Sequence, residues 1–207
     1  MLQFHFRLCF FFARSCDVIS LETSERLETL FISCRWTLWF YNADRQKSWL
    51  DNLKTVAGFD TAEDFWALFN HMCRPSGLPG GCDYSLFKAG LQLTWEDRGN
   101  SDGGCWRITL EKCQRATALD RYWVELALLV IGEGFDEACA DICGVVVNVR
   151  HKGDRLSVWM RDNSSDAVLA VGRTLKSHLQ LQVRISYFSH ADEARKMRST
   201  AKPLHQL

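Results

Sequence analysis

The stretch Leu93-Thr94-Trp95-Glu96-Asp97 places a large indole directly beside a carboxylate. On a strand these two neighbours would point to opposite faces, whereas on a loop Trp95 and Glu96 can converge on one ligand. An indole face stacks on a purine, and more strongly on a cationic one. A carboxylate accepts two parallel N–H bonds, which the Watson–Crick edge of guanine supplies. The pair therefore suits a methylated, cationic guanine; the structural alternative is a core Trp beside a surface Glu.

A second group of candidate residues lies in a basic stretch that reads as a β-hairpin. Arg150, Lys152 and Arg155 fall within six residues, around Lys152-Gly153-Asp154, and Trp159 follows them. Clustered cations can hold a triphosphate, and Arg does so with a bidentate fork. The alternative is a solvated basic turn.

Several further short sequence segments accompany these residues along the chain. They are RWTLWF at 35–40, FDTAEDFWALFNH at 59–71, GCDYSLFKAG at 81–90, TWED at 94–97, LDRYWVELALLVIGE at 119–133, CGVVVNVRHKGD at 143–154 and SHAD at 189–192. Over about residues 35–202 the chain resembles the eukaryotic translation initiation factor 4E family, whose members bind the 5′ cap of mRNA. Order and spacing are kept through many independent phrases, so the resemblance is specific.

The resemblance implies a role for each residue of a cap site. The residues that would bind the methylated base are Trp49, Trp95, Glu96 and Trp159, and those that would bind the phosphates are Arg150, Lys152 and Arg155. The first two indoles would sandwich the base, the carboxylate would accept its N1–H and exocyclic amine, and the third indole would contact the methyl group. The ligand would then be capped mRNA.

The resemblance also implies protein partners on the convex side of the fold. These are the scaffold factor 4G and the 4E-binding repressors, which share a helical Tyr-x-x-x-x-Leu-hydrophobic motif. The partner-binding residues would be Trp66, Val124, Glu125 and Leu128. Independently, Val124, Leu128 and Ile131 form a second apolar stripe on an expected helix over 119–131, which is either a second buried face or a partner surface.

Several positions depart from the pattern of the family. Cys105 stands where Arg is usual, which predicts weaker attraction of phosphates near the cap. Leu30 and Phe31 replace a His-Pro dipeptide and Ala62 replaces a Val, which puts part of the partner contact in doubt. Ser199 matches a phosphorylatable Ser, in a tail whose remaining sequence differs.

Composition limits the class of protein. The 207 residues suit one domain, and 47% hydrophobic and 24% charged residues are ordinary for a globular chain. The 25 basic and 25 acidic residues cancel, so nucleic acid would bind through a local site rather than through net charge. Nine cysteines without a C-x-x-C pair favour free thiols, and we expect no metal and no cofactor. We expect a monomer without membrane association, cytoplasmic, with nuclear or RNA-granule locations open.

Hydrophobic periodicity predicts an α+β fold. Strands are expected at 35–41, 53–59, 84–93, 106–110, 144–150, 155–160 and 183–188, and helices at 119–131, 166–181 and, in a short form, 135–142. A further helix is expected to begin at Asp60, with Glu63 at capping-box spacing, and to extend to Met72. We expect one domain over 35–207, a curved antiparallel sheet of about seven or eight strands backed by three long helices on its convex face, as in the family. Residues 1–34 are expected to be a disordered or non-native leader, and the tail from Arg195 to be mobile.

Two other classes of function remain open from the sequence. An enzyme acting on guanine nucleotides would need a reactive centre, and no G-x-x-x-x-G-K-[ST], H-E-x-x-H or G-x-S-x-G motif occurs, so we expect a non-enzymatic protein. The other class is an interaction module with an impaired pocket. Within the cap-binding class, a translational repressor with weakened scaffold binding is also open.

Overall fold

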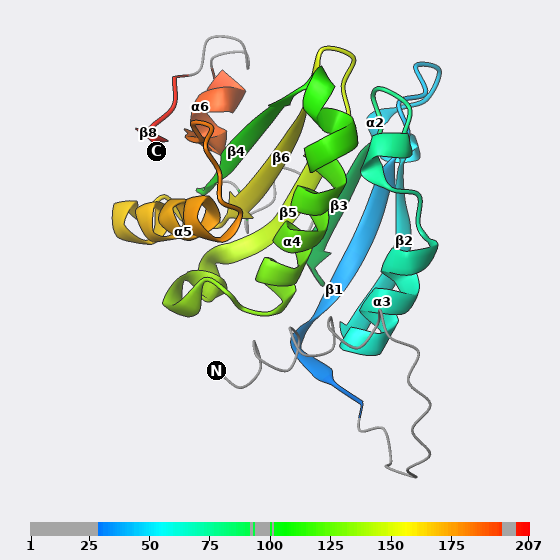
Figure 1. Ribbon diagram of the computed structural model, residues 1–207, viewed down its shortest axis with the longest axis horizontal. Helices are drawn as coiled ribbons and strands as arrows, with labels where there is room; N and C mark the ends of the chain where they lie inside the picture. Colours follow the sequence, from blue (N-terminus) through cyan, green and yellow to red (C-terminus); the bar gives the residue numbers. More distant parts are fainter. Residues whose placement is uncertain (1–28, 92, 94–99, 101, 196–201) are drawn as a thin grey trace.

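An antiparallel sheet of eight strands forms the frame of the molecule, in the order β2-β1-β3-β5-β6-β4-β7-β8 (Figure 1). The computed structural model describes residues 29–91, 93, 100, 102–195 and 202–207. The strands are β1 (Phe31–Tyr41), β2 (Leu53–Thr61), β3 (Asp83–Lys88), β4 (Gly104–Glu111), β5 (Ile142–Asn148), β6 (Gly153–Met160), β7 (Ser186–Ser189) and β8 (His205–Gln206). The predicted α+β class with a curved antiparallel sheet is confirmed.

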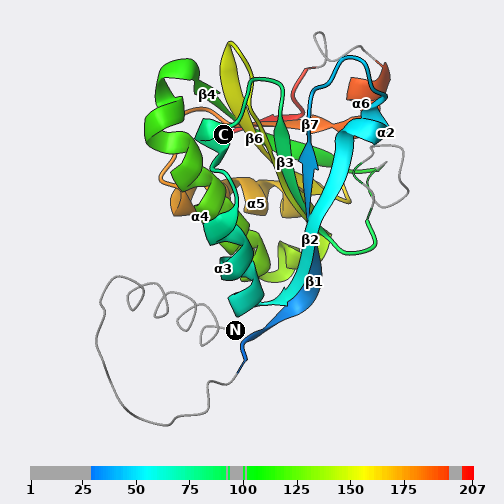
Figure 2. The same ribbon diagram turned by 90° about the vertical axis from the view of Figure 1, so that its right-hand side faces the viewer.

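Three long helices cover one face of the sheet, which we call the helical face; the opposite face is the open face (Figure 2). They are α3 (Ala62–His71), α4 (Asp120–Ile131) and α5 (Ser165–His178), and the shorter helices are α2 (Trp49–Asn52) and α6 (His190–Arg195). Single turns are η1 (Pro75–Gly77), η2 (Lys112–Gln114), η3 (Arg115–Leu119) and η4 (Asp136–Asp141). Within the described ranges, no helix has the length and apolar character needed to cross a membrane.

The core lies between the sheet and the three long helices. Because side chains alternate along a strand, every second residue of β4 and β6 faces this core. Trp106 is fully buried there, and its Nε1 donates to the carbonyl oxygen of Val168 on α5 at 2.8 Å. Trp36 of β1 is also buried, whereas Trp39 lies half-buried on the open face. The three-residue spacing puts these two indoles on opposite faces of the strand.

The start of α3 differs from the prediction. Asp60 lies at the end of β2, and Thr61 caps the helix, with its Oγ1 accepting a bond from the Asp64 N–H at 3.1 Å. Thr61 has the extended backbone that a capping residue requires. The Glu63 carboxylate accepts instead from the N–H of Leu30, at 3.1 and 3.3 Å, which ties the beginning of β1 to the helix. The predicted capping box at Asp60 is therefore wrong, although the helix itself is present.

Element boundaries also differ at several points. β1 begins at Phe31, earlier than the expected 35, and β3 ends at Lys88, because Gly90 adopts a φ of +90° that turns the chain. The short helix expected at 135–142 is the 3₁₀ turn η4, and the expected strand at 183–188 is the shorter β7.

The end of the chain is ordered rather than mobile. β8 pairs with β7, and Leu207 exchanges backbone hydrogen bonds with Ile185 at 3.0 and 3.1 Å. The predicted mobile tail is therefore wrong for residues 202–207, because the chain returns to the edge of the sheet and satisfies backbone groups there. The region 1–28 of the expected leader and Ser199 lie outside the described residues.

Candidate functional site

Three rows of side chains cross the open face, because directly opposed residues of antiparallel strands point to the same side. The first row is Tyr41, Asp83, Asn148, Arg155 and Thr109; the second is Trp39, Ser85, Val146, Ser157 and Arg107; the third is Thr37, Phe87, Gly144, Trp159 and Cys105. Aromatic side chains and arginines that are far apart in the sequence thus share one surface. Arg155 and Trp159, both predicted from the sequence, belong to it.

Trp49 begins α2, a helix that lies at the same end of the sheet as the β5–β6 turn (Figure 1). It is the first residue of α2, whose N-terminus is capped by Ser48 through a bond from the Asp51 N–H at 3.2 Å. Its ring lies beside that of Tyr41, with centroids 6.3 Å apart and planes 29° apart. The indole is 45% exposed, a large value for an aromatic side chain of this size, so one face is available to a planar ligand.

Trp159 is held from two sides on the open face. Phe87 meets it edge-on at 5.5 Å between ring centroids, and the ring of His190 lies at 4.3 Å. These contacts join it to a small apolar cluster that contains Val146 and, at its margin, Leu93. The indole is therefore fixed in place while it remains partly exposed.

The turn between β5 and β6 is organised by one buried carboxylate. Asp154, 1% exposed, accepts two bonds from the Arg115 guanidinium at 2.7 and 2.8 Å. It also accepts the backbone N–H of Arg150 at 3.0 Å. A carboxylate with charge-assisted, bidentate partners is strongly held, so the turn that carries Arg150 and Lys152 has a defined shape.

The three predicted phosphate-binding cations differ in their ion pairs and in their exposure to solvent. Arg150 forms a bidentate pair with Asp83, and this hydrogen bond raises the pKa of Arg150. Burial raises the pKa of the Asp83 carboxyl in spite of that partner. Lys152 is exposed. Arg155 makes no ion pair with any residue in the described ranges, and desolvation, followed by the nearby Arg107 guanidinium, lowers its pKa.

Arg155 and Lys152 thus have no carboxylate partner in the described ranges, whereas the charge of Arg150 is offset by Asp83. A guanidinium that is partly desolvated and lies near a second cation gains most from an incoming anion. Phosphate groups meet both conditions, because they are anionic and match the guanidinium fork.

Two of the predicted base-binding residues, Trp95 and Glu96, lie outside the described residues. Leu93 begins the segment that contains them and packs against the cluster around Phe87 on the open face. The roles of these two side chains stay predictions.

Four residues meet on the open face beside β4, and sequence reasoning did not bring them together: it named Cys105 only as a departure from the family pattern and gave no role to Arg107, His190 or Glu193. Arg107 lies over the ring of Phe188 at 4.5 Å and is paired with the buried carboxylate of Glu193. Cys105, His190 and Glu193 offer ligand atoms within 4.8 Å of one another, so they could hold a metal ion. Desolvation raises the pKa of the Cys105 thiol. Alternation around the core residue Trp106 was the available signal, since it places both of its neighbours on the open face.

The predicted partner-binding residues lie on the opposite side of the sheet. Trp66 of α3 is half-buried and packs against Phe65 and Phe69, with ring centroids 5.0 and 6.2 Å away. Val124, Glu125 and Leu128 of α4 are also half-buried. Leu128 and Trp66 rest on the same hydrophobic core. Ile131 is buried, so the second apolar stripe of α4 divides into one core residue and two that reach the surface.

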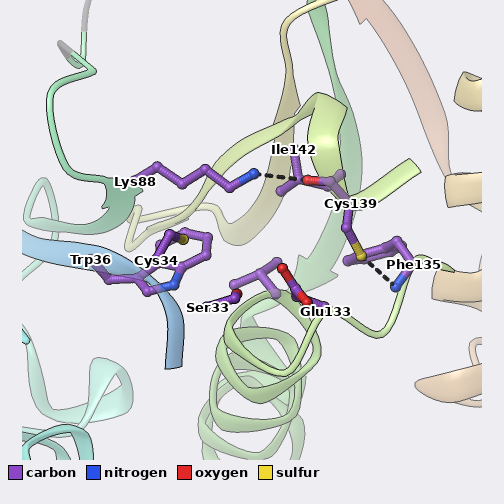
Figure 3. A pocket seen from close by; sticks show the side chains of 9 residues that line it. Ser33, Cys34, Trp36, Lys88, Glu133, Phe135, Cys139 and Ile142 are labelled. Atoms are coloured by element: carbon purple, nitrogen blue, oxygen red, sulfur yellow. Dashed lines mark hydrogen bonds between the residues drawn. The ribbon is translucent and has the colours of Figure 1, made fainter. Parts of the chain in front are cut away.

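An enclosed cavity lies elsewhere, between β1, the end of α4 and η4 (Figure 3). Its volume is about 10 Å³, room for about one water molecule. Lys88 donates to the carbonyl oxygen of Cys139 beside it at 2.8 Å, and the pKa of Cys139 is raised by desolvation. A cavity of this size cannot take a nucleotide.

The seven cysteines in the described part of the chain are all free thiols, as the sequence predicted. They are Cys34, Cys73, Cys82, Cys105, Cys113, Cys139 and Cys143. The fold is therefore held by its core and its hydrogen bonds over these ranges, and covalent cross-links are not part of the site.

The chain is similar to known proteins along most of its length. A sequence model of the family Eukaryotic initiation factor 4E matches residues 32–204. The eukaryotic translation initiation factor 4E of Xenopus laevis is 52% identical over 171 residues, which cover 81% of this chain and 80% of that protein. A crystal structure of Ascaris suum eIF4E-3 with an m2,2,7G cap gives a TM-score of 0.81 at 45% identity, covering 86% of this chain and 98% of that chain. C. elegans eIF4E-3, in complex with the 4E-binding protein Mextli and a cap analog, gives 0.80 at 42% identity, covering 86% and 99%.

Replacing Asp154 with Ala should lower the free energy of unfolding by about 2–4 kcal/mol, because Arg115 is left partly buried without its partner. Urea unfolding followed by circular dichroism measures the change. Asp44, whose side chain is 32% exposed and pairs with Lys47, provides the control, and Asp44→Ala should have a much smaller effect. Equal losses for the two variants would show that Asp154 does not hold the turn.

Proposed function

Because the chain belongs to the eukaryotic initiation factor 4E family, we propose that it binds the 7-methylguanosine cap of mRNA and recruits the mRNA to the translation initiation machinery through a scaffold protein. The observation that carries the proposal is the placement of Arg155 and Trp159 on one open face, with the exposed indole of Trp49 at its end. A cationic base needs aromatic surfaces and a polyphosphate needs cations, and the open face offers both. The Ascaris suum and C. elegans relatives described above were solved with a cap or a cap analog.

In this proposal the base is recognised by four side chains. Trp49 and Trp95 stack on its two faces, Glu96 accepts its two N–H donors, and Trp159 contacts the methyl group. Stacking contributes ~1–3 kcal/mol per base, and the cation–π interaction up to ~2 kcal/mol in a desolvated site. Micromolar binding needs ~8 kcal/mol, so the indoles supply a large part of it.

The phosphates are held unequally by the three cations. Arg155 has no carboxylate partner among the described residues, and Lys152 is exposed on the turn, so both can meet a phosphate without first losing an ion pair. Arg150 forms an ion pair with Asp83, and this carboxylate offsets the charge of the guanidinium. We therefore assign the larger electrostatic contribution to Arg155 and Lys152, and to Arg150 a role in shaping the site.

We further propose that the protein is a binding protein rather than an enzyme, and that it works in the cytoplasm. The family is that of an initiation factor, and the sequence carries none of the three catalytic or nucleotide-binding motifs considered above. Recovery of an intact cap analogue after prolonged incubation supports this assignment, and release of guanosine diphosphate would contradict it.

The helical face is proposed to bind the scaffold and repressor partners. Trp66, Val124 and Leu128 give a half-buried apolar surface from two helices, and Glu125 lies at its edge, paired with Arg121 at 3.4 Å. An amphipathic helix fits such a surface through apolar side chains spaced one turn apart. The C. elegans relative was solved with a 4E-binding protein, which agrees with this class of partner.

A cap-binding repressor with weakened scaffold binding is the second candidate, and one observation favours it. Leu30 and Phe31, which replace the usual His-Pro, lie directly beside α3, since the carbonyl oxygen of Leu30 accepts the N–H of Ala62 at 2.9 Å. Phe31 is 67% exposed. The altered residues are therefore positioned to change what approaches Trp66.

The proposed cap binding is tested by tryptophan fluorescence. We expect 7-methylguanosine triphosphate to quench the emission far more strongly than unmethylated guanosine triphosphate. Trp49→Ala and Trp95→Ala should each weaken binding about 5- to 150-fold, as expected for ~1–3 kcal/mol of lost stacking. Trp66→Ala, on the opposite face, is the control and should bind the ligand as the wild type does. Equal quenching by the two nucleotides would contradict cap recognition and support the interaction module.

Arg155→Gln should reduce both the affinity for 7-methylguanosine triphosphate and its dependence on salt, because one phosphate-neutralising charge is lost. The slope of log K against log salt should fall by about one for Arg155→Gln and by less for Arg150→Gln. Arg173→Gln on the exposed side of α5 serves as the charge-matched control and should leave the slope unchanged. A slope in Arg155→Gln equal to that of the wild type removes this residue from the phosphate site.

Trp66→Ala should weaken binding of a Tyr-x-x-x-x-Leu-hydrophobic peptide by at least about tenfold, because a central aromatic anchor of an interface typically contributes 2 kcal/mol or more. Calorimetric titration with the peptide measures the loss. Trp49→Ala is the reciprocal control. If the wild-type protein binds the cap normally but binds the peptide weakly, the repressor is favoured. If the Trp66→Ala variant binds the peptide as tightly as the wild type does, the partner binds elsewhere.

A further inference from the structure

A cluster of buried metal-binding side chains lies at the edge of the open face. The Cys105 Sγ, a ring nitrogen of His190 and a carboxylate oxygen of Glu193 are all within 4.8 Å of one another. The three residues are 1%, 3% and 5% exposed. Thiol, imidazole and carboxylate groups are all common ligands of transition-metal ions.

The backbone explains how residues so distant in sequence meet. Cys105 is opposed to Phe188 across the β4–β7 pair, and the chain enters α6 two residues later, where the His190 N–H donates to the carbonyl oxygen of Gly103 at 3.0 Å. His190 and Glu193 are three residues apart on α6, a spacing that places two side chains on the same side of a helix. The strand pair and the first turn of α6 therefore direct all three toward one point.

The chemistry of this donor set suits zinc. Zn²⁺ takes Cys, His and carboxylate ligands at about 2.0–2.3 Å in a tetrahedron, which places ligand atoms roughly 3.3–3.8 Å apart. Side-chain rotations that close the cluster by about 1 Å would reach that geometry. Mg²⁺ and Ca²⁺ require oxygen ligands and are not matched by a thiol and an imidazole. Three protein ligands leave a fourth position for water.

The carboxylate of Glu193 provides a second, independent observation. One of its oxygens pairs with the Arg107 guanidinium, which the ring of Phe188 holds at 4.5 Å. The other oxygen, Oε1, is buried and has no hydrogen-bond partner among the residues that the structure describes. Ligating carboxylates are typically oriented by a second hydrogen-bonding group in this way. Arg107 therefore orients the carboxylate of Glu193 and leaves its second oxygen available to a metal ion.

We propose that Cys105, His190 and Glu193 form a site for a zinc-class divalent ion, oriented by Arg107 and adjoining Trp159. Binding releases the thiol proton to solvent, so a dication enters, one proton leaves, and the cluster gains one positive charge. The His190 ring lies 4.3 Å from that of Trp159, so the ion would also restrain this indole. The site stands on these contacts alone and does not depend on cap binding.

The test uses the full chain, stripped with a chelator and dialysed, and titrated with zinc chloride by calorimetry. We expect one ion per chain at this site, and Cys105→Ser should weaken its binding by at least about 100-fold. Cys113→Ser, which alters an exposed cysteine elsewhere, is the matched control and should bind as the wild type does. Zinc binding that is unchanged in Cys105→Ser, or lost equally in both variants, would overturn the proposal.

Cobalt and a second variant separate metal binding from folding. Cobalt chloride should give tetrahedral d–d absorption and a thiolate charge-transfer band in the wild type, and the band should vanish in Cys105→Ser. Glu193→Gln keeps the shape and an acceptor for Arg107 but removes the ligating charge, so it should weaken zinc binding while its circular dichroism spectrum remains native. A thiolate band that persists in Cys105→Ser, or a natively folded Glu193→Gln with undiminished zinc affinity, would show that the ion binds elsewhere.

Discussion

The register of β6 between β5 and β4 is the constraint on which the rest of the molecule depends. It points Leu156 and Val158 into the core and Arg155, Ser157 and Trp159 to the open face. A slip of one residue would exchange these sets, burying an unpaired guanidinium among aliphatic side chains at a cost of several kcal/mol. Packing of the apolar core between the sheet and the helices therefore determines which side chains of β6 lie on the open face.

Carboxylates, rather than net charge, organise the electrostatics of the open face. The chain carries 25 basic and 25 acidic residues, so no overall field attracts a polyanion. Asp154, Asp83 and Glu193 each hold one arginine, at the turn, in the first row and beside α6 respectively. Arg155 lies between these pairs without a carboxylate of its own in the described ranges. Local pairing thus leaves a cation at a defined place in a neutral protein.

The sheet lies between the proposed cap-binding surface and the proposed partner-binding surface. The proposed cap-binding side chains of the strands are alternate residues on the open face, whereas α3 and α4, which carry the proposed partner-binding residues, lie on the other side of the sheet (Figure 2). Each surface can change with little effect on the other, because a substitution at an outward position leaves the core packing intact. Departures from the family pattern on both surfaces, such as Cys105 and Phe31, are compatible with an unchanged fold for this reason.

Local patterns in the sequence determined much about this protein. Hydrophobic periodicity, as in 119–131 and 155–160, predicted the class and the long helices, because these signals arise within one turn or one strand. The resemblance carried by the order of the tryptophan-containing phrases implied the roles of the candidate residues. Trp95, Glu96 and Ser199 remain predictions of that kind. Only the tertiary structure decided which distant groups meet: Arg150 with Asp83, 67 positions away, and Cys105 with His190 and Glu193. Thr61 as the cap of α3 and the return of Leu207 to Ile185 also depend on contacts beyond the local segment. The register of the strands and the pairing of the chain end with the sheet edge depend on the packing of the whole sheet. No short stretch of residues contains that information.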